Sequence, residues 1–189
     1  MGTEDLIHCL EEAFGDMDPP LPEGLVRADT TIESSFPRAV RGKTWQQLRP
    51  LAWHIPDASD LSLLSAEAYR YYLPAYLCAL ATGEGDQPYL DGVLDSLWYE
   101  GLYCNSPFQR ELWEERMPLL TDKQKNCIAH FLVEFLRRTD DRFLGQGSNR
   151  RRLESMLKKY WNACLWRPLS RPSESAARSS DPAKDPRRA

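Results

Sequence analysis

Apolar residues recur at helical spacing along most of this chain. The most regular stretch covers residues 64–81, where apolar side chains three, four and seven positions apart form one stripe. The opposite side is also largely apolar, and only Glu67 and Arg70 carry charge. The pattern therefore predicts a helix surrounded by other elements, which we call the tyrosine helix and expect at the centre of the fold. Its stripe consists of Tyr69, Tyr72, Leu73, Tyr76, Leu77 and Leu80.

Capping signals place the ends of the other helices. Thr121 and Gln124 form a capping box ahead of a strongly periodic helix that reaches Arg138. Pro107 suits the first position of another helix, because proline lacks the N–H that is unpaired there. Further N-cap residues are predicted at Thr3, Thr44 and Ser65. The predicted helices cover residues 4 to about 15, 45–48, 66–81, 89–99, 107–117, 122–138 and 148–165.

Two segments lack a helical pattern. Residues 16–42 contain four prolines among glycine, serine and aspartate, which favours a long extended connection. Residues 167–189 are rich in proline, serine, alanine and arginine and predict a disordered tail. No segment alternates as a strand does. The sequence therefore predicts an all-α protein: a single irregular bundle of about six helices in residues 1–166, followed by the tail in residues 167–189.

Charge and cysteine usage narrow the classes of partner. The net charge is −4, but residues 167–189 hold six basic and three acidic side chains, which leaves −7 on residues 1–166. An acidic body is a poor match for nucleic acid. Five cysteines without a C-x-x-C pair indicate reduced thiols in a cytoplasmic protein. No secretory signal or membrane-spanning segment is recognisable, so we expect no membrane partner.

Several short motifs line up with a known family. Together they resemble a family of small bacterial cytoplasmic proteins defined only as a domain of unknown function, over roughly residues 3 to 163. The resemblance implies an autonomous helical domain and no catalytic residue. It is carried by Gly42-x-x-Trp45-x-x-Leu48, Leu64-Ser65-x-x-Ala68-Tyr69-Arg70-Tyr71-Tyr72-Leu73-Pro74-Ala75, Leu120-Thr121-x-x-Gln124, Phe131-Leu132 and Tyr160-Trp161.

A proline inside the tyrosine helix is the first candidate for a site. Pro74 removes one helical hydrogen bond and predicts a kink, which can open a pocket. Arg70, Tyr72 and Tyr76 would then offer a guanidinium and two hydroxyls to an anionic ligand. His54, just ahead of the helix, is the candidate general base. The alternative is a packed core, in which the tyrosine hydroxyls are satisfied, Arg70 pairs with Glu67 or another acid, and the histidine is structural.

A possible metal site falls on the helix after Thr121. His130 and Glu134 are four residues apart, and Cys127 precedes them by three, which is a spacing compatible with metal ligands. The apolar register of this helix, however, predicts that His130, Glu134, Lys123, Asn126 and Arg137 share the solvated face. We therefore predict no metal site, and no sequence motif indicates a cofactor.

The strongest basic cluster is a candidate partner site. Arg150, Arg151 and Arg152 open the last helix, where positive charge opposes the helix dipole. This placement suggests an acidic partner surface. The alternatives are salt bridges to the acidic body, for instance to Glu111, Glu114 or Glu115, and nucleic-acid binding through residues 150–159.

The sequence lacks a recognisable catalytic constellation. It predicts a non-enzymatic protein-binding factor of a regulatory, accessory or immunity type. The alternative is a small-ligand-binding protein or enzyme with a pocket at Pro74, and nucleic-acid binding is a minor alternative.

Overall fold

The computed structural model describes residues 2–27, 40, 42–49, 58–83, 87–98, 107–140, 144 and 148–165. In these ranges the chain forms α-helices and short 3-10 helices, and the β contact found there is an isolated bridge between Val26 and Leu64. The all-α prediction is confirmed. The predicted tail at residues 167–189 lies outside the described residues, so the division of the chain near residue 166 stays a prediction.

The elements keep the order that the sequence predicts. They are α1 (Thr3–Phe14), η1 (Pro22–Gly24), α3 (Trp45–Leu48), η3 (Ala58–Leu63), α4 (Ala66–Thr82), α5 (Gln87–Ser96), α6 (Pro107–Arg116), η4 (Met117–Leu119), α7 (Asp122–Arg138), α8 (Ser148–Lys159) and η5 (Trp161–Cys164).

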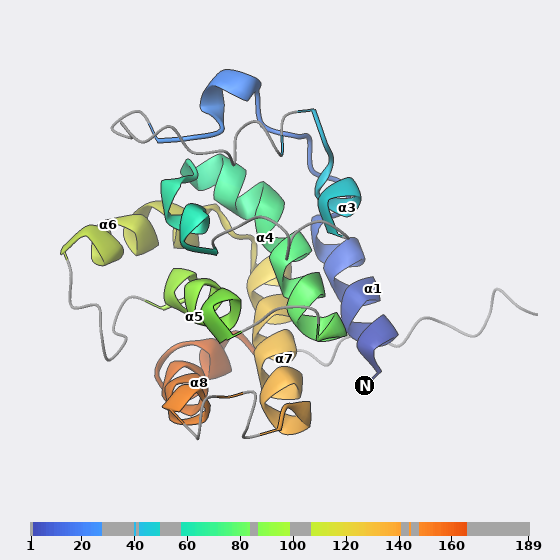
Figure 1. Cartoon of the computed structure of the whole chain (residues 1–189), viewed down its shortest axis with the longest axis vertical. Coiled ribbons are helices and arrows are strands. Elements are labelled where there is room, and N and C mark those ends of the chain that lie inside the picture. Colours follow the sequence, from blue (N-terminus) through green and yellow to red (C-terminus); the bar gives the residue numbers. More distant parts are fainter. Residues whose placement is uncertain are drawn as a thin grey trace, which may run out of the picture.

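The tyrosine helix, α4, lies at the centre of the bundle. It packs against α1, α3, α5 and α6, and α1 in turn packs against α7 (Figure 1). Every side chain from Tyr71 to Leu80 is buried, so α4 has no solvated side over these residues. The two-sided apolar pattern of the sequence predicted this position, and the prediction is confirmed.

The tyrosine hydroxyls of this core bond the main chain of neighbouring elements. The Tyr69 hydroxyl donates to the Ser96 carbonyl at 3.0 Å, which ties α4 to the end of α5. The Tyr72 hydroxyl donates to the Lys43 carbonyl at 3.2 Å, just ahead of α3. A buried hydroxyl without a partner is costly, so these bonds are what allows tyrosine to fill the core.

Most of the predicted caps are present. The Ser65 hydroxyl accepts the Ala68 N–H at 3.2 Å, and Thr121 and Gln124 bond each other reciprocally at 3.0 and 3.2 Å. The prediction for Thr3 is wrong, because α1 begins at Thr3 and Gly2 is the cap. The Thr3 hydroxyl instead accepts a hydrogen bond from Arg138 of α7 at 3.2 Å.

The last helix is shorter than the sequence predicts. The apolar stripe continues to Leu165, but α8 ends at Lys159, and the 3-10 helix η5 follows. Tyr160 between them has φ −136° and ψ −59°, outside the helical range. The break turns Trp161 into the core, where its indole N–H donates to the Leu97 carbonyl at 3.2 Å. Tertiary packing therefore overrides the helical periodicity here.

An arginine occupies the core beside α4. Arg116 is 1% exposed, and its Nη2 donates to the carbonyls of Leu61, Ser62 and Leu64 at 2.8, 3.2 and 3.0 Å. Its guanidinium carbon lies 4.3 Å from the centre of the Tyr69 ring. Burial lowers the pKa of Arg116 to about 10. Arg116 therefore joins the end of α6 to the segment that leads into α4.

Candidate functional site

The three described residues of the predicted Pro74 pocket turn toward different neighbours. Arg70 Nε donates to the Gln124 side chain of α7 at 2.9 Å. Tyr72 bonds the segment ahead of α3, whereas the Tyr76 ring stacks on Tyr89 of α5 with centroids 5.7 Å apart. The structure does not bring these side chains together. The fourth residue of this prediction, His54, lies outside the described residues, so the joint site stays a prediction.

Gln124, in the first turn of α7, connects this helix to α4 and to the end of α1. Its Oε1 accepts hydrogen bonds from Arg70 Nε and from the Thr121 N–H. Its Nε2 donates to the Ala13 carbonyl at 3.2 Å and to Met17 Sδ at 3.1 Å. The predicted pairing of Arg70 with an acid is therefore wrong, because a neutral amide takes that place.

A surface depression of about 380 Å³ lies beside this junction. We call it the acidic depression. Three of its side chains carry negative charge, one carries positive charge, and three are apolar. It is lined by Asp16, Met17, Asp18, Pro20, Glu67, Arg70 and Leu119. It therefore combines a net negative charge with an apolar surface.

The charges of the acidic depression are not neutralised by the rest of the described chain. No ion pair joins Asp16, Asp18 or Glu67 to another residue in the ranges that the structure covers. The Nη groups of Arg70 likewise have no partner among those residues. The depression is thus lined by three acidic residues and by an arginine whose four Nη hydrogens bond no described residue.

The acidic depression continues a wider acidic surface. Residues 2–27 hold seven carboxylates, all of them on exposed residues, against one arginine. That arginine, Arg27, is turned away to α6, where it bonds Glu115 at 2.7 Å and Glu111 at 3.3 Å. The amino-terminal part of the described chain therefore has a negative outer face.

The predicted partner cluster on α8 is divided. Arg152 is buried and pairs with Asp95 of α5, whereas Arg150 donates to the Thr139 carbonyl at the end of α7 at 3.3 Å. Arg151 is the exposed member of the three. The alternative of salt bridges to the acidic body is confirmed for Arg152 with Asp95, whereas the suggested partners Glu111 and Glu115 bond Arg27. A partner-binding role for the cluster stays a prediction.

The solvated face predicted for α7 is wrong at two positions. Asn126 is 6% exposed, and its Nδ2 donates to the Cys164 carbonyl of η5 at 2.8 Å. Glu134 is 9% exposed and accepts hydrogen bonds from Arg137 at 2.5 Å and Arg138 at 2.8 Å. The prediction failed at Asn126 because η5 packs on α7 and covers a position that an isolated helix exposes. At Glu134 it failed because Arg137 and Arg138 bond the carboxylate, and Arg138 also reaches Thr3 of α1.

Acid is expected to weaken the cluster around Glu134. The hydrogen bonds from Arg137, reinforced by those from Arg138, outweigh burial and lower the pKa of Glu134 from 4.5 to about 2. A lowered carboxyl pKa stabilises the fold above pH 4.5, and that stabilisation is lost as the pH falls through 2. The Arg137 side chain is 64% exposed, so solvent reduces the effect. Glu134→Gln should cost about 1 kcal/mol at pH 7.

The measurement is urea unfolding of the wild type and Glu134→Gln at pH 7 and at pH 2.5. We expect the difference in free energy of unfolding to shrink at the lower pH. Glu154→Gln, at an exposed position of α8, is the matched control and should show little difference at either pH. A cost of Glu134→Gln that stays constant with pH argues against the ionised cluster.

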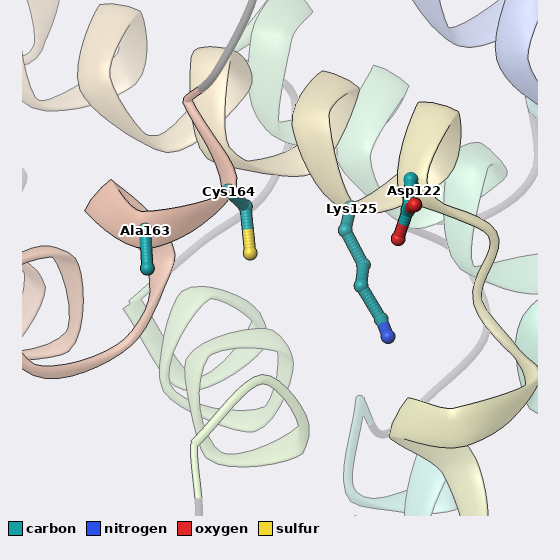
Figure 2. Close-up of a pocket in the computed structure, with 4 residues that line it drawn as sticks. All are labelled: Asp122, Lys125, Ala163 and Cys164. Atoms are coloured by element: carbon teal, nitrogen blue, oxygen red, sulfur yellow. The ribbon is translucent and has the colours of Figure 1, made fainter.

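A second depression, of about 370 Å³, lies between the first turn of α7 and η5. Figure 2 shows the Cys164 thiol and the Lys125 side chain directed into the same space, with Asp122 beside the lysine. Burial raises the pKa of Cys164 and outweighs the nearby ammonium of Lys125. Burial also raises the pKa of Cys78, to about 12. Both thiols are therefore protonated near neutral pH and are poor nucleophiles.

The described part of the chain has neither a membrane-spanning helix nor a cluster of metal ligands. None of its helices combines the length and the apolar character needed to cross a bilayer. Within the same ranges, no three side chains of His, Cys, Asp or Glu gather in a way that could hold a metal ion.

The sequence interpretation missed most of the acidic depression. It singled out Arg70 but not Gln124, which holds the arginine in place, nor Asp16 and Asp18. A signal was present in Asp16-Met17-Asp18-Pro19-Pro20, where acidic and apolar residues alternate ahead of two prolines. This pattern marks an exposed extended segment, but the sequence does not reveal which helix it lies against.

Comparison with known proteins gives a family and no function. A family model described as a family of unknown function, DUF6714, matches residues 3–165. No curated protein and no solved structure matches the chain. The match covers most of the sequence and includes the residues of both depressions.

Proposed function

We propose, for a chain that belongs to this family of unknown function, that it is a non-enzymatic helical domain that binds a basic segment of a protein partner. The observation that carries the proposal is the acidic depression with its unneutralised carboxylates. We further propose a cytoplasmic location, which is supported by the free thiols of Cys9, Cys78, Cys127 and Cys164.

The composition of the acidic depression suits a peptide that contains arginine or lysine. Asp16, Asp18 and Glu67 can accept hydrogen bonds from a guanidinium or ammonium group. Met17 and Leu119 lie in the same depression, where they can contact the methylene stems that such side chains carry. The Nη donors of Arg70 can bond a main-chain carbonyl of the same peptide. Charge and apolar contact therefore favour the same class of ligand.

Catalysis and nucleic-acid binding have less support. The thiols of Cys78 and Cys164 have raised pKa values, which suits inert side chains better than nucleophiles. In the basic cluster on α8, Arg152 pairs with Asp95 and Arg150 donates to the Thr139 carbonyl, so both bond other parts of the same chain. A phosphate backbone would also be repelled by the acidic amino-terminal face.

The proposal predicts that binding depends on two exposed aspartates. Asp16→Lys/Asp18→Lys should weaken binding of a short synthetic peptide of arginine, leucine and serine about tenfold, because two attractive charges become repulsive. Both aspartates are exposed and lie outside the helices, so the fold should be retained. The measurement is fluorescence anisotropy of the labelled peptide at low ionic strength, where charge contacts are least screened.

A matched variant separates the depression from net charge. Glu114→Lys/Glu154→Lys changes the charge by the same amount at exposed positions of α6 and α8 and should bind the peptide almost as the wild type does. Equal weakening in the two double variants would show that the peptide senses only overall charge, and the proposal would then be abandoned.

A further inference from the structure

The last described element of the chain packs on the helix that holds the arginine of the acidic depression. This element, η5, places Cys164 across the second depression from Asp122, the first residue of α7 (Figure 2). Two residues further along α7, Gln124 bonds Arg70 and Met17, which line the acidic depression. The first turn of α7 therefore lines the second depression and, through Gln124, bonds two residues of the acidic depression.

The sequence that follows carries the complementary charge. Residues 167–189 hold six basic and three acidic side chains, whereas the acidic depression holds three carboxylates and one guanidinium. Trp166 and Leu169 add large apolar side chains next to the first arginine. This segment therefore has the composition that the proposed function assigns to a partner.

We propose that residues 166–189 of the same chain occupy the acidic depression and compete there with the partner. The inference rests on the proposed function, because it assigns a second ligand and a form of autoinhibition to the same surface. Contacts between charges need no fixed backbone, so a segment that the sequence predicts to be disordered can still fill the site.

The segment is long enough to reach the site. Its 24 residues span roughly 80 Å when extended, whereas a domain of this size is about 40 Å across. A flexible tether of this kind gives an effective concentration of about 1 mM. For a site with an affinity of roughly 0.1 mM, the tethered segment reduces the apparent affinity for a competing ligand about tenfold.

The test adds the segment as a separate molecule. A labelled synthetic peptide with the sequence of residues 166–189 is titrated into two full-length chains, the wild type and a tail-neutral variant. The tail-neutral variant carries glutamine in place of Arg167, Arg171, Arg178, Lys184, Arg187 and Arg188, and the matching amide in place of Glu174, Asp181 and Asp185. We expect the tail-neutral chain to bind the peptide about tenfold more tightly, because its own segment no longer competes.

A second variant ties the gain to the acidic depression. Asp16→Lys/Asp18→Lys in the tail-neutral chain should abolish the gain. The peptide of arginine, leucine and serine is titrated in parallel. Equal affinity of the wild-type and tail-neutral chains for both peptides overturns the autoinhibition and leaves the proposed function standing. Failure of both chains to bind either peptide overturns the proposed function together with this inference.

Discussion

Leu73→Ala is expected to lower the free energy of unfolding by about 2 to 5 kcal/mol. Leu73 is fully buried in the middle of α4, so the substitution removes apolar contacts and leaves a cavity that a closely packed core fills poorly. Because α4 contacts several other helices, the loss should destabilise the whole bundle. Urea unfolding followed by circular dichroism measures the effect.

A truncation of a partly exposed side chain serves as the control for Leu73→Ala. Val133→Ala removes a side chain of α7 that is 36% exposed and should change the free energy of unfolding by less than about 1 kcal/mol. If the two variants melt alike, α4 is peripheral, and the architecture with a central tyrosine helix is wrong.

Arg116→Met is expected to destabilise the fold by about 3 kcal/mol. The Arg116 guanidinium donates buried hydrogen bonds to the Leu61 and Leu64 carbonyls. Methionine fills a similar volume but leaves both carbonyls without this donor. Each unsatisfied buried acceptor costs about 1 to 3 kcal/mol. Removing the desolvated charge offsets part of this cost, so the net effect is smaller than the sum. The variant is measured by urea unfolding.

The conservative variant tests the geometry of the Arg116 contacts. Arg116→Lys keeps a positive charge but lacks the planar fork and the guanidinium face that lies on Tyr69. It should fall between the wild type and Arg116→Met. Arg151→Met, at an exposed position of α8, serves as the control and should be nearly neutral. A stabilising Arg116→Met substitution would show that desolvation outweighs the carbonyl contacts.

Local chemistry explains why much of the fold was predictable from sequence. The capping box of Thr121 with Gln124 and the cap at Ser65 depend on neighbouring residues alone, and both are present in the structure. The two-sided apolar pattern of α4 required neighbours on all sides, and the structure supplies them. These features are encoded within a few turns of helix.

Long-range packing explains what was missed. The burial of Asn126 depends on η5, which is remote in sequence from the start of α7. Glu134 bonds Arg138, which reaches Thr3 of α1, more than a hundred positions earlier. Arg116 lies in an amphipathic helix where an arginine ordinarily reaches solvent, and only the carbonyls near Leu61 explain its burial. Periodicity describes one helix at a time and carries no information about which element covers it.

The candidate site shows the same limit. Arg70 was predicted as a ligand residue together with Tyr72 and Tyr76, but positions two and six residues along a helix point to other sides. The residues that do join Arg70 come from α7, from the segment after α1 and from η4. Asp16 and Asp18 line a common depression with Arg70 only because segments that are distant in sequence pack together there.

The most direct test of the central claim is a nuclear magnetic resonance titration. The ¹⁵N-labelled full-length chain is titrated with the arginine, leucine and serine peptide at low ionic strength. We expect the largest changes in amide chemical shift in residues 16–18, 67–70 and 119–124, which surround the acidic depression. Changes concentrated on α8 or α6, or no saturable change at all, would contradict it.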